Sequence, residues 1–173
     1  MVDAALMTSI PRVEELTFDE VVRQREVQIL RTAYRMLGNW SDAEDAAQEV
    51  FVRLHKHGLG FANEAVLNAW LYRVTVNLCV DRARRRKRWE ELPDLASGEA
   101  SAEASAIREE DKERLMKALA KLAPKERAAV VLREIEGLST AEAAQILGSS
   151  EGTIRSQISK ALDHLRRILE GGV

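Results

Sequence analysis

The residues best suited to recognise another molecule lie near the C-terminus, within 139–167. A short helical pattern over Thr140–Leu147, a glycine turn at Gly148 and a longer pattern from about residue 151 predict a helix-turn-helix. In that arrangement the first turns of the second helix face the major groove of DNA. Arginine reads guanine, serine reads several base edges, and lysine or helix N-terminal amides hold phosphate. We therefore expect DNA contacts from Thr153, Arg155, Ser156, Ser159 and Lys160.

A helical hairpin that binds nothing has the same periodicity. On periodicity alone, a solvated helix surface is therefore as good an interpretation of these residues as DNA binding. The small residues Ala141, Ala143 and Ala144 favour DNA binding, because the two crossing helices must approach closely. Residues 151–167 contain only four basic side chains, against Glu151 and Asp163. This balance predicts weak attraction to phosphates, and so poor binding to DNA alone.

A second stretch with recognition chemistry, residues 61–88, reads FANEAVLNAWLYRVTVNLCVDRARRRKR and ends in a run of six positive charges. Aromatic rings stack on unpaired bases, and a basic helix follows a nucleic-acid backbone. Core packing is the better interpretation of Trp70 and its apolar neighbours Leu71, Val74 and Leu78, which recur at helical spacing. The run 84–88 favours a bound anion instead, because adjacent like charges repel one another.

Helices must position both stretches. The chain has 173 residues, 46% apolar and 31% charged, and only 5% are aromatic, which favours an all-α fold. Helical patterns are predicted over Phe18–Leu37, from Ser41 behind an S-x-x-E capping box, and from about Ala65 into the basic run, with a bend near Asn77 left open. Further patterns cover 109–122, 125–136 with Pro124 at the first position, Thr140–Leu147 behind a capping box at Ser139, and 151–169.

Composition divides these helices into two small domains. Residues 89–108 read WEELPDLASGEASAEASAIR, which is the composition of an acidic, flexible linker. We expect an N-terminal helical domain over residues 15–88 and a C-terminal helix-turn-helix domain over residues 109–170. The net charge of −2 hides the contrast between the basic run and this linker.

Signals for other chemistry are weak. Cys79 stands alone, so no intrachain disulfide is expected, and its apolar setting predicts a buried thiol. His55 and His57 lie at i, i+2, a spacing that does not converge on one metal in a helix, and catalytic groupings are missing. We predict a protein that is not an enzyme and needs no cofactor, metal or small-molecule substrate. The N-terminus has no signal-peptide pattern and no run is long enough to span a membrane, so we expect a cytoplasmic protein.

Three blocks together resemble a known family. In order they read AYRMLGNWSDAEDAAQEVFVRLHK, then AWLYRVTVNLCVDRARRRKR, and after the linker LAPKERAAVVLREIEGLSTAEAAQILGSSEGTIRSQISKALDHLRR. The chain resembles the extracytoplasmic-function (ECF) sigma factors, the small alternative initiation subunits of bacterial RNA polymerase, over about residues 20–169.

The resemblance implies a role for each block. The helix DAEDAAQEVFVRLHK matches the element that docks on the β′ coiled coil of core polymerase, with contacts from Asp45, Gln48, Glu49 and Arg53. The helix-turn-helix matches the reader of the −35 element. The middle block matches the part that captures a flipped base of the −10 element and holds its strand, with contacts from Phe61, Asn63, Asn77, Arg82, Arg84, Arg85, Arg86, Lys87 and Arg88.

The implied function is promoter-specific transcription initiation with help in melting the −10 DNA. The implied partners are core RNA polymerase, promoter DNA and an anti-sigma factor, which often holds such a protein at the membrane. Gln157 and Leu162 stand where the family commonly has basic residues, which puts the −35 sequence preference in question. Two other classes stay open on the residues alone: a stand-alone DNA-binding regulator and a helical protein-interaction adaptor.

Overall fold

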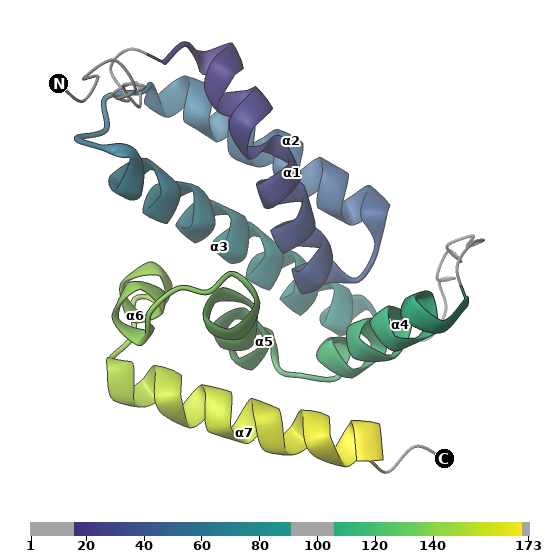
Figure 1. Ribbon diagram of the computed structural model, residues 1–173. Helices are drawn as coiled ribbons and strands as arrows, with labels where there is room; N and C mark the ends of the chain where they lie inside the picture. Colours follow the sequence, from purple (N-terminus) through teal and green to yellow (C-terminus); the bar gives the residue numbers. More distant parts are fainter. Residues whose placement is uncertain (1–15, 91–105, 171–173) are drawn as a thin grey trace, which may run out of the picture.

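The computed structural model describes residues 16–90 and 106–170, with side chains for 16–86 and 111–170. Within these residues every regular element is helical, which confirms the predicted all-α class. The elements are α1 (Phe18–Leu37), α2 (Trp40–His57), α3 (Glu64–Glu90), α4 (Ala106–Ala120), α5 (Pro124–Val130), a π-helical turn (Val131–Ile135), α6 (Thr140–Leu147) and α7 (Glu151–Glu170). In Figure 1, α5 and α6 lie between α3 on one side and α7 on the other.

Local signals place most helix ends as predicted. α1 ends at Gly38, whose left-handed φ of 83° suits a residue without a Cβ. Ser139 and Glu142 form the predicted capping box of α6, and Gly148 ends that helix with a φ of 59°. α7 begins directly after the glycine turn, at Glu151. The helix-turn-helix pattern of the sequence is therefore present.

The predicted start of α2 at Ser41 is wrong. The helix begins at Trp40, and Asn39 is its N-cap, because the Asn39 side chain accepts a hydrogen bond of 2.7 Å from the backbone N–H of Asp42. Ser41 lies exposed in the first turn. Asparagine is as good an N-cap as serine. Because Asn39 already accepts from a free N–H group of the first turn, the helix begins before Ser41.

The structure settles the form of two other helices. The bend near Asn77 that the sequence left open does not interrupt α3, which is one continuous helix of 27 residues. The single helix predicted over 125–136 is instead α5 followed by the π-helical turn, which ends with a bond from the Glu136 N–H to the Val131 carbonyl. The predicted linker overlaps helix at both ends, since α3 continues to Glu90 and α4 starts at Ala106, and its middle, residues 91–105, lies outside the described residues.

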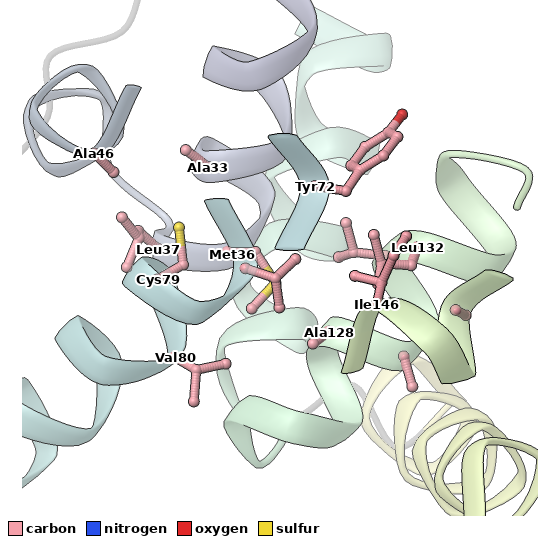
Figure 2. Close-up of a cluster of buried hydrophobic side chains, with 14 of the residues drawn as sticks. Ala33, Met36, Leu37, Ala46, Tyr72, Cys79, Val80, Ala128, Leu132 and Ile146 are labelled. Carbon is pink, nitrogen blue, oxygen red and sulfur yellow. The ribbon is translucent and has the colours of Figure 1, made fainter. Parts of the chain in front are cut away.

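Three groups of buried apolar side chains hold the helices together. One joins α1, α2 and α3, and contains Ile29, Val50, Leu54, Leu67 and Leu71. Another joins α4, α5 and α7, and contains Leu119 and Leu165. The third is shared by both halves of the chain: Figure 2 shows Met36 and Tyr72 on the N-terminal side beside Leu132 and Ile146 on the C-terminal side. The sequence predicts two domains but does not predict that they share a core.

The cap of α2 gives a first test. We expect Asn39→Ala to lower the free energy of unfolding by about 1 kcal/mol, the usual cost of losing an N-cap side chain. Ser41→Ala is the matched control and should change stability by less than about 0.5 kcal/mol, as exposed substitutions do. Urea denaturation followed by circular dichroism measures both. Equal losses for the two variants would contradict the assignment of Asn39 as the cap.

Candidate nucleic-acid interface

The first half of α7 presents an exposed polar face over a buried apolar one. Ile154 and Ala161 are completely buried against the rest of the domain. On the opposite side, all the residues predicted to read DNA are exposed: Arg155, Ser156, Ser159 and Lys160, together with Thr153 in the first turn. Ser150 caps the helix, since its hydroxyl accepts a bond of 3.1 Å from the Thr153 N–H. The helix-turn-helix thus leaves its second helix free to enter a groove.

Glu151 is a member of this face that the sequence analysis counted only as a charge. Its carboxylate accepts a hydrogen bond of 2.7 Å from Arg155 across one helical turn. The i, i+4 spacing was the signal that could have identified the pair. Both side chains are exposed, so the pair adds little to stability. Its effect in this structure is to hold the Arg155 guanidinium along the helix, toward the first turn.

The loop before α3 differs from its prediction at Phe61. That side chain is only 5% exposed, and its ring stacks on His57 at a centroid distance of 4.9 Å and meets Trp70 edge-on. A ring packed on both sides by protein cannot also stack on a base in this conformation. Phe61 therefore supports the loop from inside. The sequence does not distinguish the two roles, because an aromatic residue in a loop has the same pattern in either one.

Asn63 and Asn77 lie on the surface, as a base contact requires. Asn63 also caps α3, because its side-chain oxygen accepts a bond of 3.0 Å from the Val66 N–H. Its amide nitrogen remains available to an acceptor on a base. Asn77 precedes Arg82, the first residue of the basic run, by about one and a half turns of the same continuous helix. One helix thus carries both the polar and the cationic candidates.

The basic run starts on the surface of α3. Arg84 and Arg85 are exposed, while Arg82 donates a bond of 3.2 Å to the Asp42 carbonyl and Arg86 lies 4.0 Å from the Asp42 carboxylate. These two contacts tie the run to the start of α2. The side chains of Lys87 and Arg88 lie outside the described residues, although both residues belong to α3.

The outer face of α2 carries the four residues predicted to contact polymerase. Asp45, Gln48 and Arg53 are exposed and Glu49 is partly exposed. Arg53 donates a bond of 2.8 Å to Glu49, and this bond lowers the pKa of the Glu49 carboxyl. The face is therefore mixed in charge, which suits a polar protein interface.

The described residues show no site for metal or thiol chemistry. Among them, no group of three or more His, Cys, Asp or Glu side chains could hold a metal ion. Cys79 is completely buried, as predicted, and burial raises the pKa of its thiol to about 12. Within the same residues, no helix is both long and apolar enough to cross a membrane.

Comparison with known proteins assigns the chain to a family. Residues 21–89 match the family description Sigma-70 region 2, and residues 112–165 match Sigma-70, region 4. An RNA polymerase sigma-E factor of Streptomyces avermitilis is 40% identical over 157 residues, which cover 91% of this chain and 87% of that protein. The ECF RNA polymerase sigma factor SigM of Mycobacterium tuberculosis is 33% identical over 172 residues, covering 96% of this chain and 84% of SigM. The chain belongs to the ECF sigma factors.

Its activity follows from the family. As an ECF sigma factor it directs promoter-specific initiation by RNA polymerase and binds core polymerase and promoter DNA, and it is not an enzyme. This excludes the stand-alone regulator and the adaptor. A solved structure of CnrH in complex with the cytosolic domain of CnrY is also similar, with 27% identity and a TM-score of 0.65, covering 90% of this chain and 89% of that one.

The buried thiol gives a second test. Because the pKa of Cys79 is raised to about 12, the thiol stays protonated and shielded at pH 8, and a neutral thiol is a poor nucleophile. We expect iodoacetamide to modify the native sigma factor at least about 100-fold more slowly than the protein in urea, since reaction requires opening of the fold. Mass spectrometry over a time course measures both rates. Similar rates would contradict the burial of Cys79.

Proposed function

We propose that residues 109–170 read the −35 element through the exposed face of α7, with Arg155, Ser156, Ser159 and Lys160 at base edges and Thr153 at a phosphate. The observation that carries this proposal is the exposure of all five side chains on a helix whose other face is buried. Gln157 and Leu162 add no positive charge beside this face. The −35 contact is therefore weak on its own and gains strength from the polymerase.

Residues 15–88 bind core polymerase and the −10 element, and residues 89–108 link the two readers. On α2, Asp45, Gln48, Glu49 and Arg53 contact the β′ coiled coil. Two features support this role: the four side chains share one accessible helix face, and this face lies apart from the shared core of the two halves.

A flipped base of the −10 element is captured beside Asn63 and Asn77, and the basic run follows its strand. Phe61 acts by supporting the loop and not by touching the base. Arg84 and Arg85 lead the strand contacts because they are exposed, and Arg82 and Arg86 follow once DNA phosphates compete with Asp42. Lys87 and Arg88 extend the same charge along the helix.

An anti-sigma factor regulates this cytoplasmic protein and holds it at the membrane when its partner is anchored there. The similarity to CnrH, whose solved structure contains the cytosolic domain of CnrY, supports such a partner. Co-purification with the tagged sigma factor identifies the partner. Capture of a membrane protein would support retention of the sigma factor at the membrane.

The first experiment is run-off transcription with purified core polymerase on pooled genomic fragments, with and without this protein. New start sites that share upstream elements support the proposal and supply the promoter sequence. Stable association with core but no new starts, on core from the source organism, contradicts the assignment of the DNA contacts.

Arg155 tests the −35 contact. Once the promoter is known, we expect Arg155→Ala to weaken holoenzyme binding by about 1–3 kcal/mol on the intact promoter, the value of a bidentate contact to a guanine. On a promoter with a scrambled −35 element the loss should vanish. Arg166→Ala is the control, since Arg166 is an exposed arginine on the second half of α7. Equal losses on both promoters would show that Arg155 holds phosphate and reads no base.

Asp45 tests the polymerase contact. We expect Asp45→Lys to weaken association with core polymerase by about tenfold, because reversing a charge at an interface places like charges together. Glu26→Lys makes the same change on the exposed surface of α1 and should leave the affinity unchanged. Fluorescence anisotropy of labelled sigma factor titrated with core measures both. Identical affinities for the two variants would contradict a polymerase contact on this face of α2.

A further inference from the structure

The two halves of the sigma factor are joined by an apolar seam. On α1 and α3 it contains Met36, Tyr72, Val76 and Val80, and on the other side Ala128, Val131, Leu132 and Ile146. Figure 2 shows Met36 and Tyr72 from the first set beside Leu132 and Ile146 from the second. Ile154, the first buried residue of the −35 helix, belongs to the same core. The DNA-reading helix is thus fixed to the N-terminal half in this conformation.

Glu136, directly after the π-helical turn, reaches across the seam as an acceptor. Arg35 donates to its carboxylate at 2.6 Å, Thr32 at 2.9 Å and Tyr72 at 3.1 Å. The carboxylate side chain is 10% exposed, so these bonds replace most of its hydration. Burial, with the neighbouring Glu136 charge, raises the pKa of Tyr72 to about 12, so the phenol remains a donor. All three donors belong to the N-terminal half and the acceptor to the C-terminal half.

Arg127 reaches across the seam from the same half as Glu136, but as a donor. It is 6% exposed, and its Nε donates a bond of 2.6 Å to the Arg35 carbonyl in the last turn of α1. Carbonyls at a helix end have no partner within the helix, and the helix dipole places partial negative charge there. Burial lowers the pKa of Arg127 to about 10, which leaves the guanidinium charged at neutral pH. A cation of one half therefore caps a helix of the other.

A further bond ties the helix-turn-helix itself to α3. Arg73 donates a bond of 3.2 Å to the carbonyl of Gln145, which lies three residues before Gly148 in the turn. Arg73 is exposed on the same helix that carries Asn77 and the basic run. The turn of the −35 reader is therefore held against the −10 reader.

This arrangement cannot reach both promoter elements at once. Elements centred at −35 and −10 are about 25 base pairs apart, which is roughly 85 Å along straight duplex DNA. The whole of α3 is only about 40 Å long at 1.5 Å per residue. Duplex DNA is stiff over this length, so it does not fold back to bring the elements together without a large bending cost. The two halves must separate, and the linker predicted from the sequence is long enough to allow it.

We propose that Glu136 and Arg127 form an interdomain lock that keeps the free sigma factor closed, and that the lock opens when the protein engages polymerase and promoter. The closed form is then the resting state of the chain, and the apparent affinity for polymerase and promoter falls in proportion to the fraction of the chain that is open. The requirement to open rests on the proposed −10 and −35 contacts, but the closed state of the free chain does not.

The test uses fluorescence energy transfer within the full chain. Dyes are placed on Gln24→Cys in α1 and Arg167→Cys in α7, both exposed positions, with Cys79→Ala in every protein so that only these sites react. We expect high transfer in the free protein. Glu136→Gln should shift the closed-to-open ratio by about tenfold toward open, because three bonds lose a charged acceptor. Glu134→Gln removes the same charge from an exposed neighbour and should change nothing.

Arg127→Met provides a second variant, with the exposed Lys125→Met as its control. Circular dichroism shows whether each variant keeps its helices, so opening is distinguished from unfolding. The charge swap Arg35→Glu with Glu136→Arg should restore high transfer that Glu136→Arg alone has lost. Low transfer in the free wild-type protein would overturn the proposal. High transfer in folded Glu136→Gln and Arg127→Met would also overturn it.

The opening of the lock on polymerase and promoter is tested with the same labelled protein. Addition of core polymerase and promoter DNA should lower the transfer, and Glu136→Gln should need about tenfold less protein for half-maximal transcription. Transfer that stays high in an initiating complex would overturn the requirement to open. A closed free chain that supports no transcription with core of the source organism contradicts the proposed function instead, and leaves the lock intact.

Discussion

A charged guanidinium, that of Arg127, lies in the apolar interior, and the arrangement of the two halves depends on the group that holds it there. An unpaired buried charge costs several kcal/mol. The end of α1 offsets this cost with a free carbonyl and the negative end of the helix dipole. Gly38, which ends α1, lies beside the guanidinium: a Cβ at this position would be in ordinary van der Waals contact with it, at 3.8 Å. The closed form therefore requires that α1 stop where it does.

Glu136 complements Arg127, because the C-terminal half presents one negative and one positive side chain to the same end of α1. Together they fix the position of one half relative to the other along the apolar seam. The shapes of the apolar side chains alone would specify this position poorly. The faces proposed to bind DNA and polymerase remain outside this seam, on the first half of α7, the outer side of α2 and the basic run of α3. Locking the halves together thus leaves each contact accessible but prevents both DNA contacts from forming together.

Most of the local structure could be predicted from the sequence. Capping boxes, glycine stops and apolar spacing located the helices, because these depend on residues within four positions of one another. The errors were also local in origin. Asn39 took the cap expected at Ser41, and Phe61 turned inward because His57 and Trp70 form a pocket for its ring. Residue spacing within the loop does not reveal where the ring of Trp70, from α3, will lie.

The sequence by itself determined the family, the all-α class and the exposed faces that we propose for DNA and polymerase contacts, since helix periodicity assigns each residue to a side. It did not determine how the two halves meet. Arg127 and Glu136 look like surface charges in the sequence, because charged side chains usually are. Only the tertiary structure buries them, since their partners in α1 lie about a hundred residues away in the chain. Contacts at that separation leave no periodic trace, and they decide whether the sigma factor is closed or open.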